Sequence, residues 1–167
     1  YNRLLTITLQ RYGQMNRYKI WDLDGTVIDS SHRYSTLSNG DIDLPRWIAD
    51  NTRANIEQDT LLPLARLMQS NHRQGDIVII CTASVLGVWD QVFLADHGIK
   101  AQFILSRALG DNRGDAEMKR AKLLALFADL KIPFARWTRN ATLYDDNLGV
   151  LSMAKTFGIR TRNATTL

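Results

Sequence analysis

The stretch Tyr18–Thr26, with the sequence YKIWDLDGT, is the feature that most constrains how this chain can fold. It predicts a buried strand that ends in two aspartates, Asp22 and Asp24, followed by the sharp turn that Gly25 favours. Successive side chains of a strand point to opposite faces, so residues two apart point the same way. The two carboxylates are therefore predicted to face one crevice at the carboxyl end of this strand.

Two carboxylates in one crevice suit a nucleophile, a general acid and an oxygen ligand for a divalent cation. The pattern therefore indicates phosphoryl-transfer chemistry. A polar turn after a buried strand is the alternative that this short motif leaves open when it is taken alone.

The rest of the chain alternates predicted strands and helices, which favours an α/β fold. Ile77–Cys81 is continuously apolar, as expected of a strand buried on both faces of a parallel sheet. We predict a doubly wound, Rossmann-like parallel sheet with helices on both faces. The predicted strands are 18–23, 77–81, 101–105, 141–144 and 158–161, and the predicted helices are 43–58, 60–71, 86–97, 115–130 and 148–157.

Further polar groups fall where ligands bind in such folds, outside the carboxyl ends of the strands. Thr82-Ala83-Ser84 follows the second strand, and its hydroxyl and amide groups suit phosphate oxygens. Asp145 and Asp146 follow the fourth strand, where a helix N-cap is the alternative role. Lys119, near the start of a helix, can offset the charge of a phosphodianion, with Lys122 as the alternative.

In chain order these residues resemble the four motifs of the haloacid dehalogenase superfamily. The resemblance implies that Asp22 is the nucleophile and Asp24 the general acid and base, assisted by Thr82 and Lys119. It also implies Mg²⁺ as cofactor, held by Asp22, by the backbone carbonyl of Asp24 and by a carboxylate of the pair Asp145 and Asp146.

Within the superfamily the chain is most similar to the 3′-phosphatase domain of phage polynucleotide kinase/phosphatase enzymes. The similarity lies in Gly110-Asp111-x-Arg113-x-Asp115 followed by Lys119, in the doubled aspartate and in the helix that contains Pro63. Those domains usually show Ser-Gly-Arg where this chain has Thr82-Ala83-Ser84, so an arginine expected to hold phosphate is missing. Thr82, Ala83 and Ser84, with Arg107 or Arg113 as compensation, are the predicted substrate-binding residues.

Access to the site and the charge of the chain favour a nucleic-acid end as the substrate. The spacing between the motifs leaves room for only a minimal cap domain over the site. Residues 100–167 hold 12 Lys and Arg against 6 Asp and Glu. A basic half attracts polyanions, although it is also compatible with a solvated surface. We therefore expect removal of 3′-phosphates from polynucleotide ends. A small-molecule phosphatase such as a 5′(3′)-nucleotidase is the alternative, and a non-catalytic phosphate-binding module is a third.

Length and composition predict one phosphatase domain over residues 15–167, with residues 1–14 as an extension ahead of it. The single cysteine, Cys81, fits a reducing cytoplasm and is expected to pack in the core. The apolar runs are much shorter than the roughly 20 residues that span a bilayer, so no membrane partner is expected. The sequence does not predict the oligomeric state.

Overall fold

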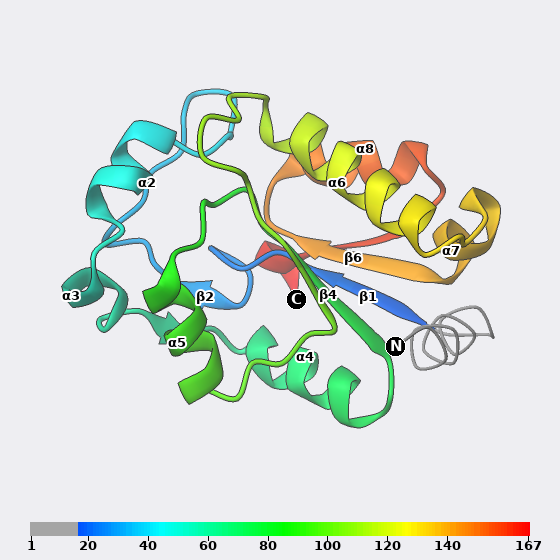
Figure 1. Cartoon of the computed structure of the whole chain (residues 1–167), viewed down its shortest axis with the longest axis horizontal. Coiled ribbons are helices and arrows are strands. Elements are labelled where there is room, and N and C mark those ends of the chain that lie inside the picture. The colour runs from blue at the N-terminus through cyan, green and yellow to red at the C-terminus, as the bar shows by residue number, and fades with distance from the viewer. Residues whose placement is uncertain (1–16) are drawn as a thin grey trace.

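The computed structural model describes residues 17–167 and shows a five-stranded parallel sheet between two layers of helices (Figure 1). The predicted extension, residues 1–14, lies outside the described residues. The strand order β5-β4-β1-β6-β7 is that of a doubly wound sheet and confirms the predicted fold class. The strands are β1 (Tyr18–Trp21), β4 (Ile77–Cys81), β5 (Phe103–Leu105), β6 (Ala141–Asp145) and β7 (Arg160–Asn163).

The central strand, β1, pairs with β4 on one side and with β6 on the other. Its side chains alternate, so Ile20 packs in the hydrophobic cluster of one sheet face and Trp21 in the cluster of the other. All five residues of β4 are buried, as its uninterrupted apolar sequence predicts. Cys81 is among them, in agreement with a packing role.

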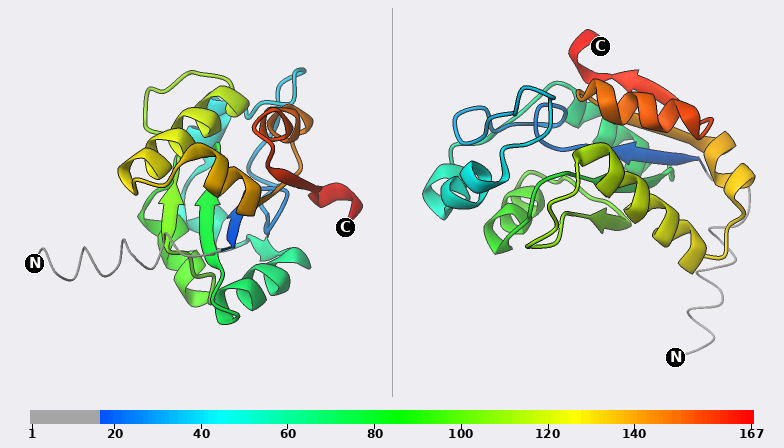
Figure 2. Two further views of the ribbon diagram at one scale, coloured as in Figure 1. Left: turned by 90° about the vertical axis from the view of Figure 1, so that its right-hand side faces the viewer. Right: turned by 90° about the horizontal axis from the view of Figure 1, so that it is seen from above.

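Helices cover the two faces unequally (Figure 2). Three lie on the face that contains Ile20, and two lie on the face that contains Trp21. The first group is α6 (Asp115–Asp129), α7 (Phe134–Asn140) and α8 (Leu148–Thr156), and the second is α4 (Leu64–Arg73) and α5 (Val88–Asp96). A short 3₁₀ turn, η1 (Ala164–Thr166), follows β7. No helix among residues 17–167 is long and apolar enough to cross a membrane.

A small insertion separates β2 (Ile28–Asp29) from β3 (Thr60–Leu61), which pair antiparallel beside the main sheet. Residues 30–59 between them contain only the short helices α2 (Leu44–Asp50) and α3 (Arg53–Ile56). The insertion corresponds to the minimal cap that the sequence predicts.

Two helix predictions in this region are wrong in their boundaries. The predicted helix 43–58 is divided at Asn51 and Thr52, because the Thr52 hydroxyl accepts a hydrogen bond from the Asn55 amide and starts a new helix. The predicted helix 60–71 begins only at Leu64, because residues 60 and 61 pair with β2 and Pro63 then fixes the start of α4.

One helix, α7, is not among those that the sequence predicts. It is short, and a stacked aromatic pair fixes its position: the rings of Trp137 and Phe127 lie 4.1 Å apart and are nearly parallel. Trp137 is fully buried in the core, so tertiary packing rather than helix periodicity determines this element.

A buried ionic network joins the insertion to the body of the domain. The Arg33 guanidinium donates to both Asp59 oxygens at 2.6–3.1 Å, to Asp90 on α5 at 3.3 Å and to Asn51 at 3.1 Å. It also stacks on the Trp47 ring, 4.2 Å from the centroid. Because Arg33 is only 2% exposed, each of these bonds compensates for lost hydration.

We expect Arg33→Met to lower the free energy of unfolding by about 3–5 kcal/mol, because Asp59 would keep a buried charge without its partner. The matched control is Arg46→Met, which removes an exposed pair with Asp50 and should cost less than about 1 kcal/mol. Urea unfolding followed by circular dichroism measures both. Equal losses in the two variants would contradict a structural role for the Arg33 network.

Candidate active site

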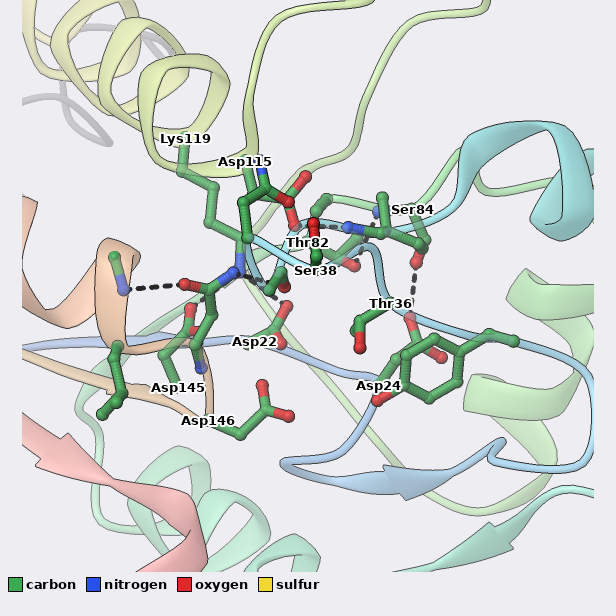
Figure 3. A pocket seen from close by; sticks show the side chains of 18 residues that line it. Asp22, Asp24, Thr36, Ser38, Thr82, Ser84, Asp115, Lys119, Asp145 and Asp146 are labelled. Atoms are coloured by element: carbon green, nitrogen blue, oxygen red, sulfur yellow. Dashed lines mark hydrogen bonds and ion pairs between the residues drawn. The ribbon is translucent and has the colours of Figure 1, made fainter.

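A pocket of about 420 Å³ lies at the carboxyl ends of β1, β4 and β6 (Figure 3). This is the edge at which the sequence predicts ligand binding. The structure brings most of the predicted site residues together in its wall, namely Asp22, Asp24, Thr82, Ala83, Ser84, Lys119, Asp145 and Asp146.

A tight turn after β1 positions the two motif aspartates. The backbone amides of Thr26, Val27 and Ile28 all donate to the carbonyl of Leu23, at 2.7–3.1 Å. The chain therefore reverses within a few residues, and Asp22 and Asp24 remain at the strand end. Both side chains are more than nine-tenths buried.

Lys119 links two of the strand ends. Its Nζ lies 2.8 Å from Asp22 Oδ1 and 2.7 Å from Asp145 Oδ2, and its side chain is 2% exposed. The residue lies one turn into α6, so this helix brings the ammonium group to the sheet edge. The two salt bridges select Lys119 over the alternative, Lys122, for the role of charge partner.

The charges of this cluster depend on one another. Burial raises the pKa of Asp22, and the nearby Lys119 ammonium opposes that rise. Burial alone would lower the pKa of Lys119, but the carboxylates of Asp145 and Asp22 outweigh it and raise that pKa overall. Lys119 therefore remains protonated while it holds the two carboxylates in place.

Asp24 is held apart from this cluster by two serines. Ser30 Oγ donates to Asp24 Oδ1 and Ser84 Oγ donates to Oδ2, both at 2.6 Å. Burial raises the pKa of Asp24, and the two hydroxyl bonds oppose that rise. Since a hydroxyl can also accept, one serine can reverse its bond when Asp24 carries a proton. This environment suits a carboxyl group that exchanges protons.

Three carboxylates can hold a metal ion. Asp22, Asp145 and Asp146 each offer an oxygen, and these oxygens lie within 4.8 Å of one another. With Lys119, they leave a formal charge of −2 when all three are ionised, which a divalent cation would balance. Oxygen ligands of this kind fit Mg²⁺. The Asp24 side chain, by contrast, faces the two serines rather than this cluster.

The two neighbouring acids differ in their surroundings. Asp145 accepts from Lys119 through Oδ2 and from the Asn147 amide through Oδ1, at 3.0 Å. Asp146 faces Gly25 instead, and burial followed by the charge of Asp145 raises its pKa to about 6. A bound cation would favour the ionised form of Asp146.

Both the backbone conformation at position 25 and the atoms around it require a glycine. Its φ is +75°, and a Cβ atom at this position would collide with a carboxylate oxygen of Asp146. The glycine therefore allows the turn after β1 to approach the acid that follows β6.

We expect Gly25→Ala to lower turnover at least about tenfold, because the added methyl displaces the Asp146 carboxylate from the cluster. Gly75→Ala is the control, since its φ of +81° imposes similar backbone strain with no atom within 4 Å of the added Cβ. Initial rates and unfolding curves should be measured for both variants. Equal activity in the two would contradict the close packing of Gly25 on Asp146.

A loop from the insertion closes the pocket on one side. Thr36 and Ile42 form an antiparallel bridge around a turn at 37–41. Three hydrogen bonds fix this cap loop (residues 35–43) to the domain. Asn147 Nδ2 donates to the carbonyl of Gly40 at 2.9 Å, the Ile42 amide donates to Asp115 Oδ2 at 2.9 Å, and the Asp115 amide donates to Asp41 Oδ1 at 3.3 Å.

The two arginines predicted to bind substrate do not line the pocket. Arg107 is buried and donates to the carbonyls of Ala83, Asp111 and Arg113 and to the carboxylate of Asp115, at 2.6–2.9 Å. Arg113 is 40% exposed and pairs with its neighbour Asp111. Arg107 thus holds the loop before α6 in place.

The segment after β4 does line the pocket. Thr82 Oγ1 accepts from the Ser84 amide at 3.2 Å, so these residues form a compact turn with Ala83 at its tip. The sequence does not predict the contacts of Ser30 and Ser84 with Asp24. Ser30 lies six residues beyond Asp24 in an ordinary polar segment, and the sequence carries no signal for its contact.

Comparisons with known proteins identify a matching family and a similar sequence. The family model "Bacteriophage T5 5′-deoxynucleotidase" matches residues 9–167. The 5′-deoxynucleotidase of Escherichia phage T5 is 29% identical over an alignment 189 positions long, which covers 98% of this chain and 73% of that protein.

Solved structures share the fold. A haloacid dehalogenase-like hydrolase from Streptococcus pneumoniae aligns with a TM-score of 0.63 and 13% identity, over 88% of this chain and 83% of that one. A chain of the Pnkp1/Rnl/Hen1 RNA repair complex aligns with a TM-score of 0.60 and 23% identity, over 90% of this chain and 43% of that one. These similarities confirm the predicted haloacid dehalogenase-like fold.

Proposed function

The chain belongs to the bacteriophage T5 5′-deoxynucleotidase family, and from that premise we propose that it removes the 5′-phosphate from deoxynucleoside monophosphates. It is a phosphatase of the haloacid dehalogenase type. The observation that carries the proposal is a small pocket in which the anchored cap loop faces the Asp22 and Lys119 cluster. Its volume of about 420 Å³ lies in the usual range for small-molecule sites, roughly 300–1,000 Å³.

In the proposed first step, a carboxylate oxygen of Asp22 attacks phosphorus and the bond from phosphorus to the ester oxygen breaks. Asp24 gives its proton to the departing oxygen, and an aspartyl-phosphate remains on the enzyme. Asp24 then takes a proton from water, whose oxygen attacks phosphorus and releases Asp22. The ammonium of Lys119 lies where it can offset the negative charge of both steps.

A divalent cation fits this chemistry, and Mg²⁺ is our proposal. Asp22 and a carboxylate of the pair Asp145 and Asp146 would supply ligands, together with the backbone carbonyl of Asp24. A bound cation would supply charge stabilisation for the phosphoryl group. Thr82 and the turn of Ala83 and Ser84 lie where they can position phosphate oxygens.

We expect Asp22→Asn to reduce turnover to below about a hundredth of the wild-type rate, because an amide of nearly the same volume is a poor nucleophile. Asp96→Asn, an exposed site at the end of α5, is the control and should retain activity. The wild-type enzyme, acid-quenched after mixing with radiolabelled deoxynucleotide, should carry hydroxylamine-sensitive label, and Asp22→Asn should carry none. Turnover by Asp22→Asn near the wild-type rate would remove Asp22 from the nucleophile role.

The substrate is tested by comparing kcat/KM for three phosphomonoesters with and without Mg²⁺. These are a deoxynucleoside 5′-monophosphate, the corresponding 3′-monophosphate and an oligonucleotide with a 3′-phosphate. We expect the 5′-monophosphate to be preferred and EDTA to abolish its hydrolysis. Preference for the oligonucleotide would instead support the polynucleotide 3′-phosphatase that the sequence predicts. No hydrolysis of any phosphomonoester would support a non-catalytic phosphate-binding module.

A further inference from the structure

Part of the sheet surface beyond α4 carries a cluster of cations outside the catalytic pocket. Trp21 and Tyr144 belong to the hydrophobic cluster under α4 and α5, so the residues two positions earlier in each strand, Lys19 and Thr142, point to the same face. Arg160 and Arg162 continue this face on β7 and are both exposed.

The strand register arranges these residues in two rows. Lys19 pairs with Thr142, which pairs with Arg160, so the three side chains lie side by side across β1, β6 and β7. The next row is formed in the same way by Trp21, Tyr144 and Arg162. Strand spacing is about 4.8 Å, so each row extends roughly 10 Å across the sheet.

These rows form a hollow of about 500 Å³, separate from the catalytic pocket. Among the described residues, four cations line it and no acid does. The lining consists of Arg17, Lys19, Thr142, Tyr144, Arg160, Thr161 and Arg162, and we call it the basic face. None of these residues lines the catalytic pocket.

The positive charges of the basic face repel one another. Burial lowers the pKa of Lys19, and the charges of Arg17, Arg160 and Arg162 add to that effect, whereas Asp76 opposes it. Asp76 itself pairs with Arg17, at 2.7 Å. The face therefore holds more positive charge than its neighbouring acid can balance, and an anion that spans it would relieve this repulsion.

We propose that the basic face binds the phosphate backbone of a nucleic acid. The face presents guanidinium, ammonium and hydroxyl groups, and groups of these kinds bind phosphate oxygens. Trp21 and Tyr144 stack on each other with ring centroids 3.7 Å apart and are buried, so they offer no open ring for base stacking. Binding should therefore be independent of base sequence.

The same observations disfavour an acidic protein as the partner. Protein interfaces are usually built around a core of apolar and aromatic side chains. The aromatic ring that lines this hollow, Tyr144, is 93% buried, and the remaining lining residues are polar or charged. This site goes beyond the proposed nucleotidase activity, because it adds a surface that would hold the enzyme on nucleic acid.

The test uses the whole chain and a fluorescent single-stranded DNA of mixed sequence, with affinity measured by anisotropy at several salt concentrations. Four backbone contacts predict a slope of log affinity against log salt of about −3, since each contact contributes roughly −0.7. Removing two charges with Arg160→Gln and Arg162→Gln together should flatten the slope by about 1.4 and weaken binding about tenfold or more at low salt.

The matched control removes two exposed charges from the opposite side of the sheet, with Arg120→Gln on α6 and Arg139→Gln on α7. We expect this control to retain the wild-type slope, and both double variants to retain wild-type hydrolysis of a deoxynucleoside monophosphate. Lys19→Gln serves as a second variant of the basic face if the β7 variant folds poorly.

Three outcomes would overturn the proposal. The first is the absence of salt-dependent DNA binding by the wild-type chain. The second is an equal loss of affinity in the basic-face variant and the control. The third is competition by polyglutamate as strong as that by unlabelled DNA, which would assign the face to acidic proteins instead. Each readout is independent of the nucleotidase assay, so failure of the proposed activity and failure of this surface are distinguishable.

Discussion

The salt bridges of Lys119 with Asp22 and Asp145 are the interaction on which the site depends. They bring together charges from three separate parts of the chain, the ends of β1 and β6 and the first turns of α6. Two buried carboxylates without the ammonium would repel each other at the centre of the sheet edge. With it, a single ammonium group bonds to both carboxylates and holds the two strand ends close together.

The parallel sheet makes that interaction possible. Because β1, β4 and β6 run in one direction, their carboxyl ends meet at one edge, and short segments after each strand supply the polar groups. The hydrophobic clusters on both sheet faces fix the strands, so the proposed catalytic groups project from rigid elements. The anchored cap loop supplies a further wall of the pocket.

The sequence predicts the site residues whose positions depend on local strand and helix patterns. It does not predict the residues whose roles depend on contacts between distant parts of the chain. Asp22, Lys119 and Asp145 could be found because each lies at the end of a strand or the start of a helix that periodicity identifies. Ser30 could not, because its role rests on a contact with Asp24 that only the folded turn creates. Arg107 was expected at the substrate because of its charge. Its guanidinium instead donates to backbone carbonyls and to Asp115, and no sequence pattern reveals these contacts.

The attachment of the cap loop has a consequence for changing what the enzyme accepts. Asn147 follows the acid pair directly, and Asp115 lies one helical turn before Lys119, so the loop is attached to neighbours of the proposed catalytic groups. Exchanging residues 35–43 for the loop of a relative would therefore disturb catalysis unless positions 115 and 147 were exchanged with it. Engineering of substrate scope in this scaffold has to treat the loop and its two attachment points as one transferable unit.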